Sequence, residues 1–315
     1  KENKMTNMYR IQELLRAKAS AEAELKLIPY SGTPEIKENA SGKYLYMRKR
    51  ELGKVKSVYV DKYSQELYDT LLRYSKRSRE LNKQIRHINK ELALLGYESR
   101  EITSRVQLNL DFARANLKAN IYDQAVLEGV ATTFPQTETI IDNGIVSGVT
   151  ATDVQKILNL KHAWEFILDK DVLLSPSDYY VLCNVAQLVN EGFYYNGGKI
   201  RSVPVKIGGC SYTPPIPNET DVMQDISELI NRNGSPIDVA ISLCLYCMKT
   251  QIFNDGNKRS AVIFANHFLI GKGEGLLVIP EQNVEQFKKL LVDYYEGRNE
   301  QTICQFLIEK CWRKF

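Results

Sequence analysis

The chain has 315 residues, a hydrophobic fraction of 43% and a net charge of +4. The length predicts two domains, or one domain with an extension, and the composition supports a hydrophobic core. No apolar run reaches about 18 residues and the first residues are polar, so the sequence predicts neither a transmembrane helix nor a secretory signal. We therefore expect a cytoplasmic protein with no membrane partner.

The charge is divided unevenly along the chain. Residues 1–96 carry a net charge of +9 and the remainder carries −5, which suggests two regions with different partners. The six cysteines all lie in the C-terminal half, and no Cys or His pair complements Cys244 and Cys247 at the spacing of a zinc site. We expect six reduced cysteines that serve packing.

Two heptad patterns in the first third of the chain predict a pair of helices. Between residues 67 and 95, the spacing of apolar residues alternates between four and three, with one polar interruption at Ser78. A shorter pattern covers residues 11–28. Neither helix can bury its apolar stripe alone, so we predict an antiparallel helical arm over residues 1–97.

A basic segment separates these helices. In residues 43–60, tyrosines precede a Gly-containing turn at 51–54 and valines follow it. This pattern predicts a β-hairpin at the tip of the arm. Its cations include Arg48, Lys49 and Arg50. Such a hairpin could contact nucleic acid or an acidic protein, or it could be a solubilising cap, and the sequence leaves these alternatives open.

Two apolar helices flank a polar turn, QIFNDGNKR, at residues 251–259. Ser235 and Pro236 are the cap and first position of the preceding helix. Apolar residues between 261 and 269 form the following helix, and Gly271 and Gly273 are predicted to end it. The turn therefore lies at a helix N-terminus.

This location favours an anion, because a helix N-terminus offers unpaired backbone N–H groups and a positive dipole end. Gly256 lets a ligand approach the backbone, Asn257 has an amide donor, and Lys258 and Arg259 supply charge. Asp255 suits Mg²⁺, which prefers one carboxylate plus phosphate oxygens. These residues predict a triphosphate site; the alternative is a solvated helix start at which Asp255 only caps.

From Phe253 to Arg259 the chain resembles the signature of the Fic/Doc (Fido) family, H-x-F-x-[D/E]-[G/A]-N-[G/K]-R. The resemblance covers about residues 100–300 and leaves the arm outside. Four further stretches resemble family features in order. They are EGVATT (128–133) with an inhibitory helix, ILNLKHAWEFIL (157–168) with the helix after it, GGKIRSVPVKIGG to YTPPIP (197–217) with the flap hairpin, and GEGLLVIPE (273–281) with the segment after the core.

The resemblance implies a mainly helical, Fic-like domain at residues 98–315 with a β-hairpin flap, a core at about 150–300 and an inhibitory helix at about 116–130. The family transfers a nucleotide fragment, usually AMP from ATP, to a protein hydroxyl, and its Doc branch transfers phosphate. The implied cofactors are ATP and Mg²⁺, and the implied partner is a protein target that the sequence does not identify.

The resemblance also assigns roles to individual residues. In the polar turn, it implies that Asp255 binds Mg²⁺ and that Arg259 binds phosphate. It also implies that the anion pocket is lined by Gly256, Asn257 and Lys258. In the flap, around residues 203–213, it predicts a clamp that holds a target segment by strand addition and includes Val205, Ile207 and Tyr212.

The pattern fails at Gln251, which occupies the position of the family's general base, a histidine. A glutamine amide cannot accept a proton at neutral pH and can only orient a hydroxyl. Loss of a general base typically costs about 10²–10⁴ in rate, while positioning and charge neutralisation survive. We therefore predict retained binding and impaired transfer. The chain has three histidines, and His267 is expected to be a packing or solvent residue that does not replace the missing base.

Glu128 matches the family's inhibitory glutamate, but its surroundings depart from the pattern. Gln124 replaces the Ser or Thr of that motif, and Val262 replaces a second arginine that pairs with the glutamate in many members. We expect Glu128 either to contact Lys258 or Arg259 and repel ATP, or merely to cap a helix.

The leading hypothesis is a Fic-like protein that transfers AMP from ATP to a protein hydroxyl and is impaired by Gln251. Two alternatives stay open. One is a non-catalytic module that senses or binds a nucleotide, and the other is a nucleic-acid-associated adaptor that uses the basic arm.

Overall fold

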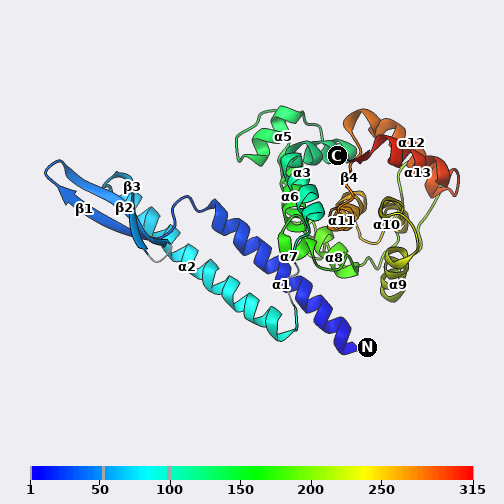
Figure 1. Ribbon diagram of the computed structural model, residues 1–315. Helices are drawn as coiled ribbons and strands as arrows, with labels where there is room; N and C mark the ends of the chain where they lie inside the picture. Colours follow the sequence, from blue (N-terminus) through cyan, green and yellow to red (C-terminus); the bar gives the residue numbers. More distant parts are fainter. Residues whose placement is uncertain (1, 52–53, 98–100, 315) are drawn as a thin grey trace. The chain divides into compact units, whose positions relative to one another are not determined.

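The computed structural model of the protein describes residues 2–51, 54–97 and 101–314. The chain divides into two compact units, Lys1–Glu98 and Ser99–Phe315. Most of the described residues are helical, as predicted, and the strands among them form small antiparallel sheets (Figure 1). Within these residues, no helix combines the length and the apolar character needed to cross a bilayer.

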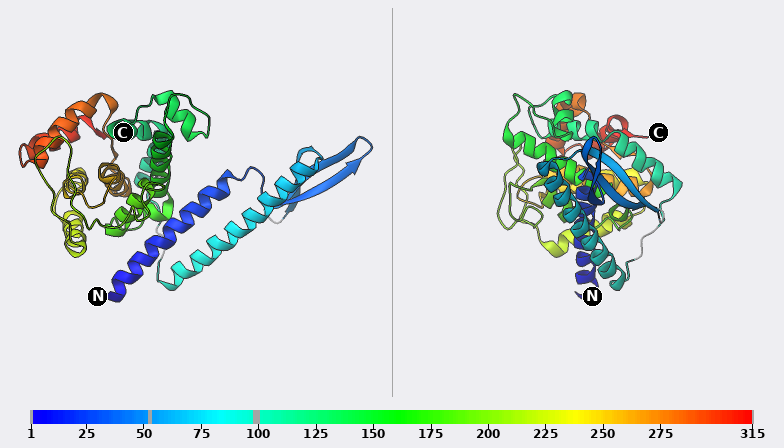
Figure 2. Two further views of the ribbon diagram at one scale, coloured as in Figure 1. Left: turned by 180° about the vertical axis from the view of Figure 1, so that it is seen from behind. Right: turned by 90° about the vertical axis from the view of Figure 1, so that its left-hand side faces the viewer.

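The first unit contains two long helices, α1 (Glu2–Leu27) and α2 (Gln65–Leu94), which lie side by side and run in opposite directions (Figure 2). Ion pairs near both ends fix their register. Arg10 is 2.7 Å from Glu91, and Arg77 is 2.5 Å from Glu24. These side chains are partly exposed, so the pairs orient the helices more than they stabilise them. The helical arm is therefore formed as predicted.

The tip of this unit is a three-stranded antiparallel sheet in the order β1 (Thr33–Asn39), β2 (Gly42–Glu51) and β3 (Lys54–Lys62). The predicted hairpin of β2 and β3 is present, but its turn at Leu52 and Gly53 lies outside the described residues. The prediction missed β1 because this edge strand is polar and contains a proline, a residue that sheets tolerate at an edge.

One face of the sheet packs on α2. Leu45 and Met47 of β2 form a buried cluster with Leu71 of α2, and Tyr68 and Tyr74 pack around it. Alternate residues of a strand point to opposite faces, so the residues on either side of Leu45 and Met47 face away from α2.

The second unit is built around one buried helix, α11 (Asn257–Lys272), with other helices on its sides (Figure 1). Every residue from Arg259 to Ile270 is buried, as expected for a helix that is surrounded by its own domain. The remaining helices, in chain order, are α3 (Ser104–Ala115), α4 (Leu117–Leu127), α5 (Phe134–Ile141), α6 (Ala151–Ile167), α7 (Lys170–Leu173), α8 (Tyr179–Val189), α9 (Glu219–Asn231), α10 (Pro236–Thr250), the 3₁₀ helix η1 (Glu281–Asn283), α12 (Val284–Tyr295) and α13 (Glu300–Lys310). The strands β4 (Leu276–Leu277) and β5 (Trp312–Arg313) pair with each other.

The local signals at α10 and α11 are confirmed except at Gly271, which lies inside α11 and does not end it. The side chain of Ser235 accepts a hydrogen bond from the backbone N–H of Asp238, and Pro236 opens α10. Gly273 ends α11 in the left-handed conformation, with φ of 71°. These caps place the polar turn between two well-defined helix ends.

The predicted β-hairpin flap is wrong for this structure, because residues 199–217 contain no strand. Four prolines in this stretch lack the N–H that a strand ladder needs. The carbonyls are satisfied by a side chain instead. Arg201 is 1% exposed and donates hydrogen bonds to the carbonyls of Val203 at 2.8 Å and Pro215 at 2.5 Å. The flap is therefore an irregular loop closed around a buried guanidinium.

Candidate active site

The turn between α10 and α11 is anchored by apolar residues and one amide. Ile252 and Phe253 are 0% and 1% exposed. The side chain of Asn257 accepts from the N–H of Phe253 at 2.9 Å and donates to the carbonyl of the same residue at 2.8 Å. Its second amide hydrogen bonds to Oε1 of Gln251 at 3.1 Å. Asn257 thus fixes the turn, and it has no amide hydrogen left for the anion pocket that we predicted it to line.

Gly256 is required by the close approach of this turn to the end of α8. Its φ is 74°, and a Cβ atom there would lie 2.8 Å from Cγ1 of Val189 and 2.9 Å from Oδ1 of Asn190. Asn190 in turn donates to the carbonyls of Asp255 at 3.0 Å and Gly197 at 3.1 Å. Asn190 therefore joins the turn to the segment before the flap, a role that no sequence signal indicates.

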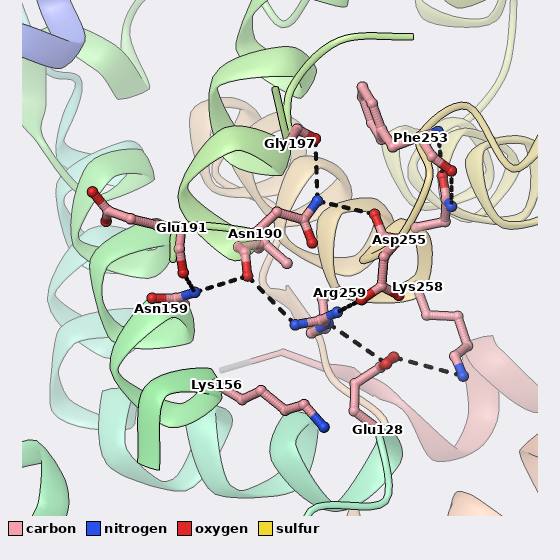
Figure 3. A network of polar contacts seen from close by, with 12 residues as sticks. Glu128, Lys156, Asn159, Asn190, Glu191, Gly197, Phe253, Asp255, Lys258 and Arg259 are labelled. Carbon is pink, nitrogen blue, oxygen red and sulfur yellow. Dashed lines mark hydrogen bonds and ion pairs between the residues drawn. The ribbon is translucent and has the colours of Figure 1, made fainter. Parts of the chain in front are cut away.

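Arg259 lies at the centre of a polar network (Figure 3). It is 3% exposed, and one Nη atom is 3.1 Å from a carboxylate oxygen of Asp255. The other Nη donates to the carbonyl of Val189 at 3.4 Å. Its Nε is 3.5 Å from Glu128 but makes no hydrogen bond. The buried guanidinium therefore has one N–H that is not satisfied, next to a carboxylate.

Glu128 reaches this network from the end of α4, as Figure 3 shows. Its side chain is 13% exposed and lies 3.7 Å from Nζ of Lys258. The carboxylate atom Oε1 is buried without a hydrogen bond. The structure thus brings Glu128, Lys258 and Arg259 together, as the sequence suggested, at ion-pair distances.

Gln124 explains how α4 is held against α11. Its side chain is buried, donates to the backbone carbonyl of Arg259 at 2.8 Å and accepts from the indole of Trp164 at 2.8 Å. The residue that departs from the Ser or Thr of the family motif is therefore a bridge between helices. It fixes Glu128, which follows four residues later in the chain, next to the guanidinium.

The N-terminus of α11 offers backbone donors. Gly256 caps this 16-residue helix without a side-chain acceptor, and the first backbone bond of the helix runs from the N–H of Ser260 to the carbonyl of Gly256. The N–H groups of residues 257–259 therefore point out of the helix end. Lys258 is partly exposed beside them. The combination can bind an anion of several oxygens.

Asp255 is half-exposed beside the same helix end. Among the residues that the structure describes, no three His, Cys, Asp or Glu side chains are grouped to hold a metal ion. One carboxylate oxygen of Asp255 is 3.1 Å from Arg259, and a single carboxylate of this kind is the protein ligand that Mg²⁺ commonly combines with phosphate and water oxygens.

Gln251 closes α10 in the left-handed conformation, with φ of 49°. The side-chain amide of Gln251 donates to the backbone carbonyl of Met248 at 2.6 Å. The backbone carbonyl of Gln251 accepts a hydrogen bond from Nε of Arg201 at 2.6 Å. The amide is therefore held by the protein, and it offers no proton acceptor comparable to an imidazole.

The two histidines of this unit, His162 and His267, contact residues outside the polar turn. His267 is 1% exposed, lies 2.8 Å from Ser177 and 2.8 Å from the carbonyl of Val172, and burial lowers its pKa to about 4. It is a packing residue, the first of the two predicted alternatives. His162 lies 3.7 Å from Glu191 on the surface.

The three residues predicted to form the flap clamp, Val205, Ile207 and Tyr212, differ in their surroundings. Val205 and Ile207 are half-buried, and the ring of Tyr212 stacks on Tyr295 with centroids 6.5 Å apart. The backbone N–H and hydroxyl of Ser211 both donate to Glu296 at 3.0 Å. The tip of the flap is therefore tied to the end of α12.

Comparison with known proteins agrees with this geometry. The sequence profile of the Fic/DOC family matches residues 176–269, which contain the turn and most of α11. Residues 8–69 match DUF6788, a domain of unknown function. The protein adenylyltransferase Fic of Aedes aegypti is 23% identical over 219 residues, which are 65% of this chain and 42% of that protein. The corresponding protein of Drosophila mojavensis is 25% identical over 64% of this chain and 42% of its own length.

This chain spans less than half the length of the curated relatives that it matches. Solved structures agree in fold. Fic-1 from C. elegans superposes with a TM-score of 0.53 at 15% identity, over 75% of this chain and 76% of that one. A Fic domain containing signaling protein from Bacteroides thetaiotaomicron has a TM-score of 0.50 at 18% identity, over 61% and 75% of the chains. The profile match assigns residues 176–269 of this chain to the Fic/DOC family, and the relatives and the shared fold support that assignment.

Proposed function

We propose that this protein binds ATP with Mg²⁺ at the N-terminus of α11 and is built to transfer AMP to a protein hydroxyl, with the chemical step impaired by Gln251. The observation that carries the proposal is the buried guanidinium of Arg259, whose Nε makes no hydrogen bond and which lies in the first turn of a helix that has no side-chain cap. The name protein adenylyltransferase, carried by relatives at 23–25% identity, supports the same activity.

In this proposal the phosphates lie on the backbone amides of residues 257–259, with Lys258 and Arg259 neutralising their charge. Gly256 has no Cβ, so the turn can approach Val189 and Asn190 at the end of α8 and keep the helix N-terminus in place. Asp255 would hold Mg²⁺, and the ion would neutralise charge on the phosphates when bound. The proposed domain covers residues 98–315, with its core at about 150–300.

We further propose that Glu128 competes with the nucleotide. Its carboxylate lies 3.5 Å from Nε of Arg259 and 3.7 Å from Nζ of Lys258, so it uses the charge that a phosphate would need. A carboxylate and a phosphate near the same cations repel each other. The helix α4 would then act as the inhibitory segment, and ATP binding would require Glu128 to turn away.

The transfer step forms a bond between the target's hydroxyl oxygen and the α-phosphorus of ATP, and it breaks the bond from that phosphorus to the leaving pyrophosphate. The hydroxyl proton must leave during this step. Gln251 cannot take it, because its amide is not basic and is held by Met248 and Asn257. We therefore propose that the rate falls by about 10²–10⁴ relative to a chain with a base at this position.

A second candidate function is nucleotide binding without transfer. It is favoured by the same engagement of Gln251, whose two side-chain groups stabilise the turn in place of reacting. Binding would be retained in this case, because the phosphate site does not include the Gln251 side chain.

The test compares the native chain with Gln251→His. Each is incubated with ATP, Mg²⁺ and a cell lysate, and mass spectrometry measures addition of AMP to itself and to lysate proteins. Titration calorimetry measures ATP binding to both. Gln282→His, which places a histidine at an exposed glutamine, is the matched control.

AMP adducts that rise at least about a hundredfold in Gln251→His alone would support an impaired transferase. ATP binding without adducts in either form would favour the second candidate. If neither form binds ATP, both candidates are wrong.

A further inference from the structure

The outer face of the arm sheet carries three tyrosines that the packing of the arm does not use. Tyr44 and Tyr46 alternate with the buried Leu45 and Met47, so they lie on the face away from α2. Tyr59 of β3 is paired with Tyr46 and is 51% exposed. These three tyrosines form a continuous aromatic surface, which we call the tyrosine face.

The rings of the tyrosine face contact one another. The centroids of Tyr46 and Tyr59 are 5.6 Å apart with the rings nearly perpendicular, and those of Tyr44 and Tyr59 are 6.3 Å apart. Tyrosine has few rotatable bonds, and this mutual contact restricts the rings further. The face therefore presents aromatic edges and planes in a fixed arrangement to whatever meets it.

Positive charge surrounds this face. Residues 33–62 contain eight Lys and Arg and four Asp and Glu. The ammonium group of Lys37 lies 4.6 Å from the ring centre of Tyr46, and Arg48 and Lys62 are exposed on the strands that carry the tyrosines. The side chain of Arg50 is not described.

Three of the four acids in this segment have partners, and one of them, Asp61, accepts a hydrogen bond from the backbone N–H of Lys62 at 2.7 Å. Glu35 accepts a hydrogen bond from Ser57 at 3.0 Å and lies 3.9 Å from Lys37. Glu38 lies 3.8 Å from Lys43. Cations therefore outnumber acids around the tyrosine face, although the carboxylate of Asp61 lies near Tyr59.

We propose that the tyrosine face binds single-stranded nucleic acid, with unpaired bases stacked on Tyr44, Tyr46 and Tyr59 and the phosphates held by cations such as Arg48 and Lys62. Fixed aromatic rings within a basic surface are the two components that such binding requires. An acidic protein would need the cations but would gain less from three tyrosines. The proposal concerns the arm alone and does not depend on the site at α11.

The binding is tested on the full chain by fluorescence anisotropy with labelled single-stranded DNA and RNA of about 12 nucleotides. Each stacked base contributes enough that Tyr46→Leu or Tyr59→Leu should weaken binding by about fivefold or more. Tyr59→Phe keeps the ring and should bind like the native chain. Tyr195→Leu, at a tyrosine of the other unit that is 96% exposed, is the matched control and should have no effect.

The cations are tested by the salt dependence of the same binding. Arg48→Gln should lower the slope of log affinity against log salt by about 0.7, the value for one phosphate contact on a single strand, whereas Lys288→Gln on α12 should not. Circular dichroism verifies that each variant is folded.

Three results would each overturn the proposal. The first is no binding at about 50 mM salt, where phosphate contacts are strong. The second is equal binding by the tyrosine-to-leucine variants and the native chain. The third is competition by poly-glutamate as effective as competition by an unlabelled oligonucleotide, which would identify an acidic protein as the partner.

Discussion

The guanidinium of Arg201 and the backbone carbonyl of Gln251 are joined by a hydrogen bond of 2.6 Å between Nε and O. The backbone N–H of Arg201 also donates to the carbonyl of Ile252 at 2.9 Å. Since the same guanidinium holds Val203 and Pro215, one buried side chain connects the flap to Gln251, the residue that we propose to occupy the general-base position. The left-handed turn at Gln251 is thus fixed from the flap side.

Arg201→Met should therefore destabilise both segments. The variant leaves the carbonyls of Gln251, Val203 and Pro215 without their donor, and we expect the free energy of unfolding to fall by about 3 kcal/mol. Urea denaturation measures this loss, and limited proteolysis should show faster cleavage between residues 203 and 213. Arg86→Met, at an exposed arginine of α2, should change neither. Native-like resistance of the flap to protease in Arg201→Met would show that the guanidinium does not hold it.

Gly256→Ala should destabilise the turn through two effects that add. An alanine at φ of 74° adopts a conformation that L-residues avoid, and its Cβ would meet Val189 at 2.8 Å. We expect the free energy of unfolding to fall by about 2–4 kcal/mol. Gly234→Ala is the control, since a Cβ there has open space and the backbone φ is not positive. A loss no larger than that of the control would mean that α8 moves aside easily.

Local signals in the sequence were sufficient to predict the two helices, α10 and α11, that carry the candidate site. Caps and apolar periodicity located α10 and α11. These features depend on neighbours in the chain, so a single sequence reveals them. The heptad pattern predicted the arm helices for the same reason.

The parts that sequence analysis missed depend on contacts between distant residues. From the sequence alone, Arg201 would be expected to be a surface cation. In the structure, its hydrogen-bond acceptors are backbone carbonyls of the flap and of Gln251, 50 residues later in the chain. Gln124 reads as a departure from a motif, yet it bridges Trp164 and the backbone of Arg259. The polar β1 strand becomes visible only when β2 is beside it.

Glu128→Gln should strengthen ATP binding. The substitution keeps the shape of the side chain but removes the charge that faces Arg259 at 3.5 Å and Lys258 at 3.7 Å. Release of these cations should raise the affinity for ATP with Mg²⁺ by about tenfold, which corresponds to about 1.4 kcal/mol, and calorimetry measures it directly. Glu285→Gln, at an exposed glutamate of α12, should leave the affinity unchanged. An unchanged or weaker affinity in Glu128→Gln would contradict a competing role for this carboxylate.

The stability of the protein should depend on pH through His267. In the folded state burial lowers the pKa of His267 to about 4, whereas the pKa in the unfolded chain is about 6.5. Between these values the unfolded chain binds more protons, so the contribution of His267 is complete above pH 6.5 and is lost as the pH falls toward 4. Burial also raises the pKa of Asp178 to about 6, and this group acts in the opposite direction between pH 4 and 6.

The contribution of His267 is isolated by comparing variants at each pH, because Asp178 is common to all of them. The difference in unfolding free energy between the native chain and His267→Gln should shrink by about 3 kcal/mol from pH 7 to pH 4. Ser177→Ala removes the hydroxyl 2.8 Å from the ring but keeps the imidazole, so it should lower stability by a similar amount at every pH. Urea denaturation at several pH values provides the measurement. A difference between His267→Gln and the native chain that stays constant with pH would mean that the buried ring accepts a proton without cost to the fold.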